Sequence, residues 1–187
     1  MGTIYVFLAE GFEDIEALGT VDILRRSGLE VVTVSISDEY FVTSAHNVPI
    51  GADALFSEID FSDAQLLVLP GGLPGSVNLK DFKPLQELLL KHNGEGKLIA
   101  AICAAPMALG NIGLLNGKRA TCYPGCQDTM TGAEYTAELC TVDGNIITGE
   151  GPAAVFPFAY KLVEILVGED TANALRQGMM FKHLLGR

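Results

Sequence analysis

The sequence predicts a three-layer α/β sandwich, in which helices cover both faces of a mostly parallel sheet. The chain has 187 residues, which corresponds to one domain over residues 1–187 with a small elaboration. Hydrophobic residues make up 49% of the chain and charged residues 19%, which is enough apolar material for a sizeable core. Short runs that are apolar on both faces alternate with segments of helical spacing. This alternation is typical of a parallel sheet that is buried on both sides.

The first elements are a strand, a helix and a second strand. Residues 3–9 are a β-rich apolar run that ends before Glu10 and Gly11. Residues 13–26 follow with apolar side chains at helical spacing, and residues 29–36 form the next strand.

Two further strands are expected in the middle of the chain. Residues 66–69 are fully apolar and end at Pro70, and residues 98–102 form another buried strand. Between them the pattern predicts a helix over residues 84–92. In open α/β sheets, ligands bind at the carboxyl ends of the strands, where loops lead into helix N-termini. The loops after these strands are therefore the candidate site.

The last third of the chain predicts a small antiparallel hairpin and two helices. Residues 138–148 contain strand-like runs on both sides of residues 142–145, where Asp-Gly supplies the positive φ angles of a tight turn. A long helix is expected to end at about Val167. Asp170 is expected to cap a last helix that reaches about Gln177.

Charge and hydropathy exclude several classes of protein. Twelve Lys and Arg against 23 Asp and Glu give a net charge of −11, so a polyanionic nucleic acid would be repelled on average. The uncharged segment Leu98–Leu115 is interrupted by Pro106 and glycines, so it favours a strand and a helix over a membrane span. The N-terminus lacks the pattern of a signal peptide. We expect a cytoplasmic protein without membrane or sequence-specific nucleic-acid partners.

The four cysteines are expected to be reduced and free of metal. A chain of this length with its own core needs no disulfide framework. Cys122 and Cys126 have a loose metal-like spacing, but no second Cys or His pair accompanies them. Zinc is therefore disfavoured.

Cys103 lies where a buried strand turns sharply into a helix whose start is indicated by Pro106. This pattern resembles a nucleophile elbow. Amides at the helix N-terminus would stabilise a thiolate there and lower the pKa of the thiol. The alternative is a small buried hydrophobe, since free Cys is among the most buried residue types. Spacing alone does not choose between the two.

Two further segments are expected near Cys103. Glu16 lies more than one turn into a helix with a buried stripe, so its carboxyl is a candidate to face the same cleft and exchange protons with a substrate. For Glu13 and Asp14 we favour a solvated acidic first turn that interacts with the helix dipole. Gly71-Gly72 is either an ordinary turn or a backbone that approaches the cleft closely and offers amides to an oxyanion.

Five segments together are similar to the ThiJ/PfpI superfamily, specifically the branch of the Parkinson-disease-associated protein deglycase (DJ-one). The resemblance covers nearly the whole chain, and five segments in order are far more specific than any one. They are Gly11 to Ala17, Val21 to Gly28, Val68 to Gly72, Ala100 to Pro106 and Thr148 to Pro152.

The resemblance implies a flavodoxin-like fold and a homodimer. It implies a nucleophilic or redox-active thiol at Cys103 with its carboxyl partner at Glu16, and backbone amides from Gly72 and Ala104 around the sulfur. Activities of the family include conversion of methylglyoxal to lactate without a cofactor, removal of early glycation adducts from proteins and nucleotides, and sensing of peroxide through the cysteine.

The chain departs from the family at two positions. Glyoxalases of the family usually carry a His at the position of Tyr123, and a phenol is a poor general base at neutral pH. Acid–base chemistry is then expected to rest on Glu16, although Tyr123 is a candidate contact for a substrate oxygen. The protease branch places His directly after the cysteine, where this chain has Ala104. A Cys-His protease is therefore disfavoured.

The leading hypothesis is a cofactor-independent glyoxalase or protein deglycase, hence a lyase or hydrolase. The Cys103 thiolate attacks an α-oxoaldehyde or the carbinol carbon of its adduct, Glu16 moves a proton between adjacent carbons, and the amides of Gly72 and Ala104 stabilise the oxyanion. The alternative is an oxidative-stress sensor or redox-regulated chaperone in which Cys103 is oxidised to sulfinic acid. A third hypothesis is a non-catalytic domain with a vestigial cysteine.

Overall fold

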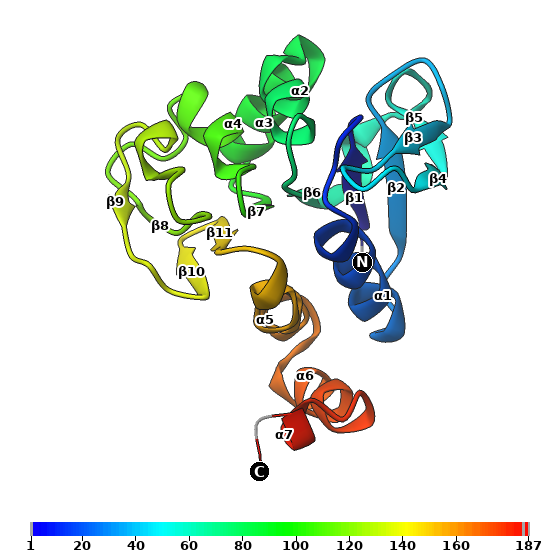
Figure 1. Cartoon of the computed structure of the whole chain (residues 1–187), viewed down its shortest axis with the longest axis vertical. Coiled ribbons are helices and arrows are strands. Elements are labelled where there is room, and N and C mark those ends of the chain that lie inside the picture. The colour runs from blue at the N-terminus through cyan, green and yellow to red at the C-terminus, as the bar shows by residue number, and fades with distance from the viewer. Residues whose placement is uncertain (1, 185, 187) are drawn as a thin grey trace.

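The computed structural model of the protein describes residues 2–184 and residue 186. Its centre is a seven-stranded sheet with the order β10-β11-β7-β6-β1-β2-β5 (Figure 1). Neighbouring strands are parallel except β10 and β11, which form an antiparallel hairpin. The strands are β1 (Thr3–Leu8), β2 (Val31–Ser35), β5 (Ala54–Leu55), β6 (Ala64–Leu69), β7 (Leu98–Ile102), β10 (Cys140–Asp143) and β11 (Ile146–Gly149).

Helices cover both faces of the sheet, and Figure 1 shows the two groups on opposite sides of the strands. One layer contains α1, α5, α6 and α7, and the other contains α2, α3 and α4. The predicted three-layer α/β sandwich with a mostly parallel sheet and a small hairpin is confirmed. The helices are α1 (Asp14–Arg26), α2 (Gly75–Asp81), α3 (Lys83–Gly94), α4 (Pro106–Asn111), α5 (Val155–Val167), α6 (Glu169–Gly178) and α7 (Phe181–Leu184).

Successive residues of the central strands belong to two different cores. In β1, Ile4 and Val6 lie in the core that includes Phe158 of α5, whereas Tyr5 and Phe7 lie in the core under α3. This alternation follows from the strand geometry, since neighbouring side chains point to opposite faces of a sheet. Both faces are apolar, which is why the strands appear in the sequence as continuous apolar runs.

Several short elements were not predicted. Segments of two or three strand residues are too short to show a periodicity, and α2 lies among Gly, Pro and polar residues that indicate a loop. These elements are β3 (Phe41–Thr43), β4 (Pro49–Gly51), the edge strand β5, β8 (Arg119–Ala120), β9 (Glu134–Tyr135), α2, α7 and the 3-10 turns η1 (Phe56–Glu58), η2 (Phe61–Asp63), η3 (Gln127–Thr129) and η4 (Pro152–Ala154).

The prediction for the C-terminal helices is wrong in two details. Asp170 does not cap α6, because the helix already begins at Glu169 and Gly168 occupies the N-cap position with φ of 97°. A further helix, α7, follows α6, so α6 is not the last one. The uncharged segment Leu98–Leu115 divides into β7 and α4, and none of the described helices has the length and apolar character needed to cross a bilayer.

Truncation of Phe158 tests the core that joins α5 to the sheet. Phe158 is fully buried, so Phe158→Ala is expected to lower the free energy of unfolding by about 3–5 kcal/mol. Phe41→Ala is the matched control, because Phe41 is 71% exposed and its loss is expected to change stability by less than about 0.5 kcal/mol. Urea denaturation measures both. Equal losses of unfolding free energy in the two variants would contradict the burial of Phe158 between α5 and the sheet.

Candidate active site

The sheet order brings three loops together at one edge. Strands β1, β6 and β7 are neighbours and run parallel, so their carboxyl ends lie side by side. The turn that leads into α1 follows β1, Gly71-Gly72 follows β6, and Cys103 follows β7. This is the edge at which open α/β sheets bind ligands.

Cys103 has the strained backbone of a sharp strand-to-helix turn. Its φ is 64°, in the left-handed region that residues with a side chain seldom adopt. Neighbouring segments hold this conformation: the Cys103 amide donates to the carbonyl of Gly149 at 2.9 Å, and its carbonyl accepts from the amide of Tyr123 at 2.9 Å. Cys103 is largely buried. Strain that is held in this way is a feature of functional sites.

Glu16 places a fully buried carboxyl beside this cysteine. Its Oε2 accepts a hydrogen bond from the amide of Gly71 at 2.8 Å. Its other oxygen, Oε1, is buried without a well-formed hydrogen bond to any described residue, and the carboxyl interacts with the Cys103 thiol. One oxygen is therefore anchored to the backbone and the other is free for proton transfer.

The two glycines after β6 are required by close packing. A Cβ on Gly71 would lie 2.5 Å from the Cβ of Cys103 and would also collide with the Glu16 carboxyl. Gly72 has φ of 94°, and a Cβ there would lie 2.5 Å from the amide nitrogen of Glu13. Because both positions lack a side chain, the backbone approaches the carboxyl and the sulfur closely.

Burial dominates the electrostatics of the pair. Burial, with a smaller contribution from the nearby charge of Glu13, raises the pKa of Glu16 from 4.5 to about 7. The pKa of Cys103 is also raised, first by burial and then by the carboxylate of Glu16. The backbone amides of Gly72 and Ala104 lower it in part. The predicted lowering of the Cys103 pKa is therefore wrong in its net direction, although the two amides act on the sulfur in the expected sense.

Two acidic groups in one buried site cannot both be ionised at low cost. Below about pH 7 both Glu16 and Cys103 hold their protons, and above it the pair retains a single proton. When that proton is on Glu16, the repulsion that raises the pKa of Cys103 is removed. In that state Cys103 is a thiolate and Glu16 is a neutral carboxylic acid.

An open pocket of about 250 Å³ gives access to the sulfur. Its walls come from the N-cap residue of α1, the loop between β3 and β4, the loop after β6, the turn after β7 and the segment after β8. Tyr123 separates it from a second hollow of about 350 Å³. The lining residues of the first pocket are Glu13, Ala45, His46, Gly72, Leu73, Cys103, Ala104, Tyr123 and Cys126.

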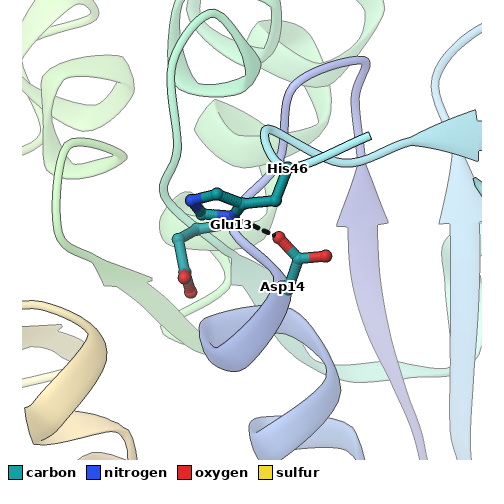
Figure 2. Close-up of side chains that lie close together, drawn as sticks. All are labelled: Glu13, Asp14 and His46. Atoms are coloured by element: carbon teal, nitrogen blue, oxygen red, sulfur yellow. Dashed lines mark hydrogen bonds and ion pairs between the residues drawn. The ribbon is translucent and has the colours of Figure 1, made fainter. Parts of the chain in front are cut away.

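Glu13 and Asp14 differ from the predicted solvated first turn. Glu13 is buried, caps α1 by accepting from the Glu16 amide at 2.7 Å, and lines the pocket. Asp14 accepts a hydrogen bond from Nδ1 of His46 at 2.7 Å (Figure 2). Only the fold brings His46 to this site, since it comes from the loop between β3 and β4.

The three side chains of Figure 2 have potential metal-ligand atoms within 4.8 Å of one another. Hydrogen bonding accounts for their arrangement, because Asp14 is paired with His46 and Glu13 caps α1.

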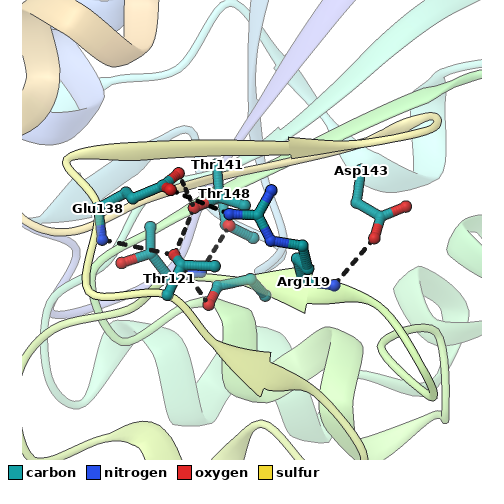
Figure 3. A network of polar contacts seen from close by, with 8 residues as sticks. Arg119, Thr121, Glu138, Thr141, Asp143 and Thr148 are labelled. Atoms are coloured by element: carbon teal, nitrogen blue, oxygen red, sulfur yellow. Dashed lines mark hydrogen bonds and ion pairs between the residues drawn. The ribbon is translucent and has the colours of Figure 1, made fainter.

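A network of polar contacts fixes the segment that carries Tyr123 (Figure 3). The Thr121 amide donates to Oγ1 of Thr148 on β11 at 2.9 Å, and the Arg119 amide donates to the Asp143 carboxylate at 2.9 Å. Arg119 also pairs with Glu138 at 3.0 Å. These contacts bind β8 to the hairpin and hold Tyr123 at the mouth of the pocket.

The sequence of this chain is similar to one protein family and to named members of it. The DJ-1/PfpI family matches residues 2–165. Protein DJ-1 homolog B of Arabidopsis thaliana is 41% identical over 88% of this chain, which spans 38% of that longer protein. The glutathione-independent glyoxalase DJR-1.2 of Caenorhabditis elegans is 34% identical over 89% of both chains.

The fold also agrees with that of a solved structure. Oxidized DJ-1 of Toxoplasma gondii superposes with a TM-score of 0.92 at 34% identity, covering 96% of this chain and 98% of that one. Together with the family match over most of the sequence, this likeness identifies the protein's family: the chain belongs to the DJ-1/PfpI family.

Proposed function

We propose that the protein is a cofactor-independent cysteine enzyme that converts α-oxoaldehydes such as methylglyoxal into α-hydroxy acids. The observation that carries this proposal is the buried pair of Glu16 and Cys103 at a pocket of about 250 Å³. The pair can exchange one proton while the sulfur attacks a carbonyl carbon. The glyoxalase named among the relatives supports the same reaction class.

The reaction begins with the proton on Glu16 and the negative charge on Cys103. The thiolate attacks the aldehyde carbon and forms a C–S bond, and the electron pair of the C=O bond moves to oxygen. The amides of Gly72 and Ala104, which favour the thiolate, remain beside the developing oxyanion. Glu16 then protonates that oxygen, which leaves a hemithioacetal and a Glu16 carboxylate.

The second stage moves a hydrogen between adjacent carbons. The Glu16 carboxylate removes the proton from the former aldehyde carbon and returns it to the former ketone carbon. As the hydroxyl proton of the hemithioacetal passes to the former ketone oxygen, the hemithioacetal becomes a thioester of the α-hydroxy acid, with no net oxidation. Water cleaves the thioester, and Cys103 is released. Glu16 is suited to this work because its Oε2 is anchored by Gly71 while Oε1 is free.

The same chemistry extends to early glycation adducts: the sulfur attacks the carbinol carbon as its C–N bond breaks, and Glu16 protonates the departing amine, which gives the same hemithioacetal. The hollow beside Tyr123, lined by Leu139 and Pro152, offers room for the attached protein or nucleotide. A homodimer and a cytoplasmic location belong to this proposal. Exposed Ile15 and Leu18 on α1 offer an apolar surface for dimer formation.

Substitution of the pair tests the proposed activity. Cys103→Ser is expected to abolish lactate formation from methylglyoxal in the absence of glutathione and metal, because the attacking thiolate is lost. Glu16→Gln is expected to lower kcat by about 10²- to 10⁴-fold, because the amide cannot move the proton. Enzymatic detection of D- and L-lactate measures both.

Cys140→Ser is the matched control, because Cys140 lies on β10 and does not line the pocket. It is expected to keep the wild-type rate. Circular dichroism verifies that each variant is folded. Wild-type turnover in folded Glu16→Gln would contradict the proton transfer, and turnover in Cys103→Ser would contradict thiol catalysis.

A second candidate function, redox sensing, is favoured by the polar groups around the sulfur. The amides of Gly72 and Ala104 and a protonated Glu16 are placed to donate hydrogen bonds to the oxygens of a sulfinate at Cys103. The solved Toxoplasma gondii relative is described as oxidized. Two equivalents of peroxide would convert the thiolate to sulfenate and then sulfinate, with release of water.

Limited peroxide treatment followed by peptide mass spectrometry tests this function. Oxygen addition is expected at Cys103 before Cys122 and Cys140, because Cys103 lines the open pocket and has the Glu16 carboxyl beside it to take its proton, whereas Cys122 and Cys140 do not line that pocket. Glu16→Gln is expected to slow the reaction at Cys103. Equal oxidation of all the cysteines would contradict redox selectivity.

A further inference from the structure

His46 brings a titratable side chain to the Cys103 pocket from a distant part of the chain. Both residues line the same pocket of about 250 Å³. The histidine comes from the loop between β3 and β4, whereas Cys103 follows β7. The pocket therefore contains an imidazole that is contributed by a segment far from Cys103 in the sequence.

The loop that carries His46 is bound to the segment between β1 and α1. The Gly11 amide donates to the carbonyl of Thr43 at 2.8 Å, and the Ala45 amide donates to the carbonyl of Phe12 at 2.8 Å. The side chain of Glu10 accepts from the Thr43 amide at 3.0 Å. The backbone of His46 is thus fixed relative to the helix that carries Glu16.

Asp14 fixes the orientation and favours the charged form of the imidazole. Its carboxylate bonds to Nδ1 at 2.7 Å, so Nε2, on the other side of the ring, is left for a ligand (Figure 2). This hydrogen bond and the charge of Asp14 raise the pKa of His46 above 6.5, and Glu13 adds to the effect. The pKa of Asp14 is lowered, since its hydrogen bonds with Ser44 and His46 outweigh burial.

The other titratable groups that face this pocket are acidic when they ionise. Glu13 caps α1 through its carboxylate, Cys103 is the attacking group, and Tyr123 and Cys126 complete the wall. Of these lining side chains, His46 alone can carry a positive charge. It also remains 69% exposed, so it can exchange protons with solvent between turnovers.

We propose that His46, oriented by Asp14, is a catalytic residue that moves a proton between the two oxygens of the bound α-oxoaldehyde. The inference rests on the proposed function, and it divides the work of the isomerisation between two residues. Glu16 moves hydrogen from carbon to carbon, and His46 moves it from oxygen to oxygen.

Glu16 takes up a proton and gives it back during the isomerisation, and His46 gives up a proton and takes one back. As Glu16 removes the proton from the former aldehyde carbon, a C=C bond forms and the imidazolium of His46 gives its Nε2 proton to the ketone oxygen. The product of this step is a sulfur-bound enediol. Glu16 then protonates the former ketone carbon while neutral His46 accepts the proton of the other hydroxyl, whose electron pair forms the thioester C=O bond. Both residues return to their starting states.

The test compares His46→Gln with His183→Gln, which changes an exposed histidine in α7. His46→Gln is expected to lower kcat/KM for methylglyoxal by about 10²-fold, whereas His183→Gln is expected to leave it unchanged. In wild type, kcat/KM is expected to rise through about pH 7 as the Glu16–Cys103 pair loses its first proton, and to fall at higher pH as His46 deprotonates. The fall is expected to disappear in His46→Gln.

Two further variants separate chemistry from loop structure. Asp14→Asn removes the charge that favours the imidazolium, so the alkaline fall is expected to move to lower pH. Added imidazole is expected to restore part of the activity of His46→Gly but none of the activity of Cys103→Ser.

If wild type is active and His46→Gln is equally active, the proposed role of His46 is wrong. The same conclusion follows if the alkaline fall persists in His46→Gln. Neither result would contradict the proposed function. Absence of lactate formation by wild type would overturn the proposed function and this role with it.

Discussion

The site depends on one constraint: a carboxyl and a thiol are buried together, and no cationic side chain among the described residues contributes to the pKa of either group. Glu16 is fully buried, and its Oε2 is held by the Gly71 amide at 2.8 Å. Burial raises the pKa of both Glu16 and Cys103, so the site favours a single negative charge. A shared proton makes the thiolate available only when the carboxyl is neutral. The same carboxyl is therefore placed to act first as an acid and then as a base.

Much of the surrounding structure maintains this arrangement. Gly71 and Gly72 have no room for a Cβ, and Cys103 keeps a left-handed backbone because Gly149 and Tyr123 bond to its peptide groups. Such a conformation costs on the order of 1–3 kcal/mol, which the well-packed sheet offsets. The parallel order of β1, β6 and β7 then brings the strained turn, the glycines and α1 to one edge.

The sequence predicted the elements with strong patterns and missed those that only tertiary structure defines. Apolar runs marked the central strands. The turn at Cys103 and the buried stripe of α1 made Cys103 and Glu16 candidates for one cleft, and their pairing was implied by the family resemblance. The contribution of His46 could not be predicted, because its loop is short and polar and meets the pocket only after folding. The net direction of the Cys103 pKa was also missed, since burial depends on packing that local spacing does not reveal.

The most direct test of the central claim is a pH titration of glutamate side chains by ¹³C NMR with carboxyl labelling. The account predicts one glutamate resonance with a midpoint near pH 7, and it predicts that this resonance is absent from Glu16→Gln. That result would show that Glu16 retains its proton close to neutral pH. Titration of every glutamate near pH 4.5 would contradict the shared proton on which the proposed chemistry depends.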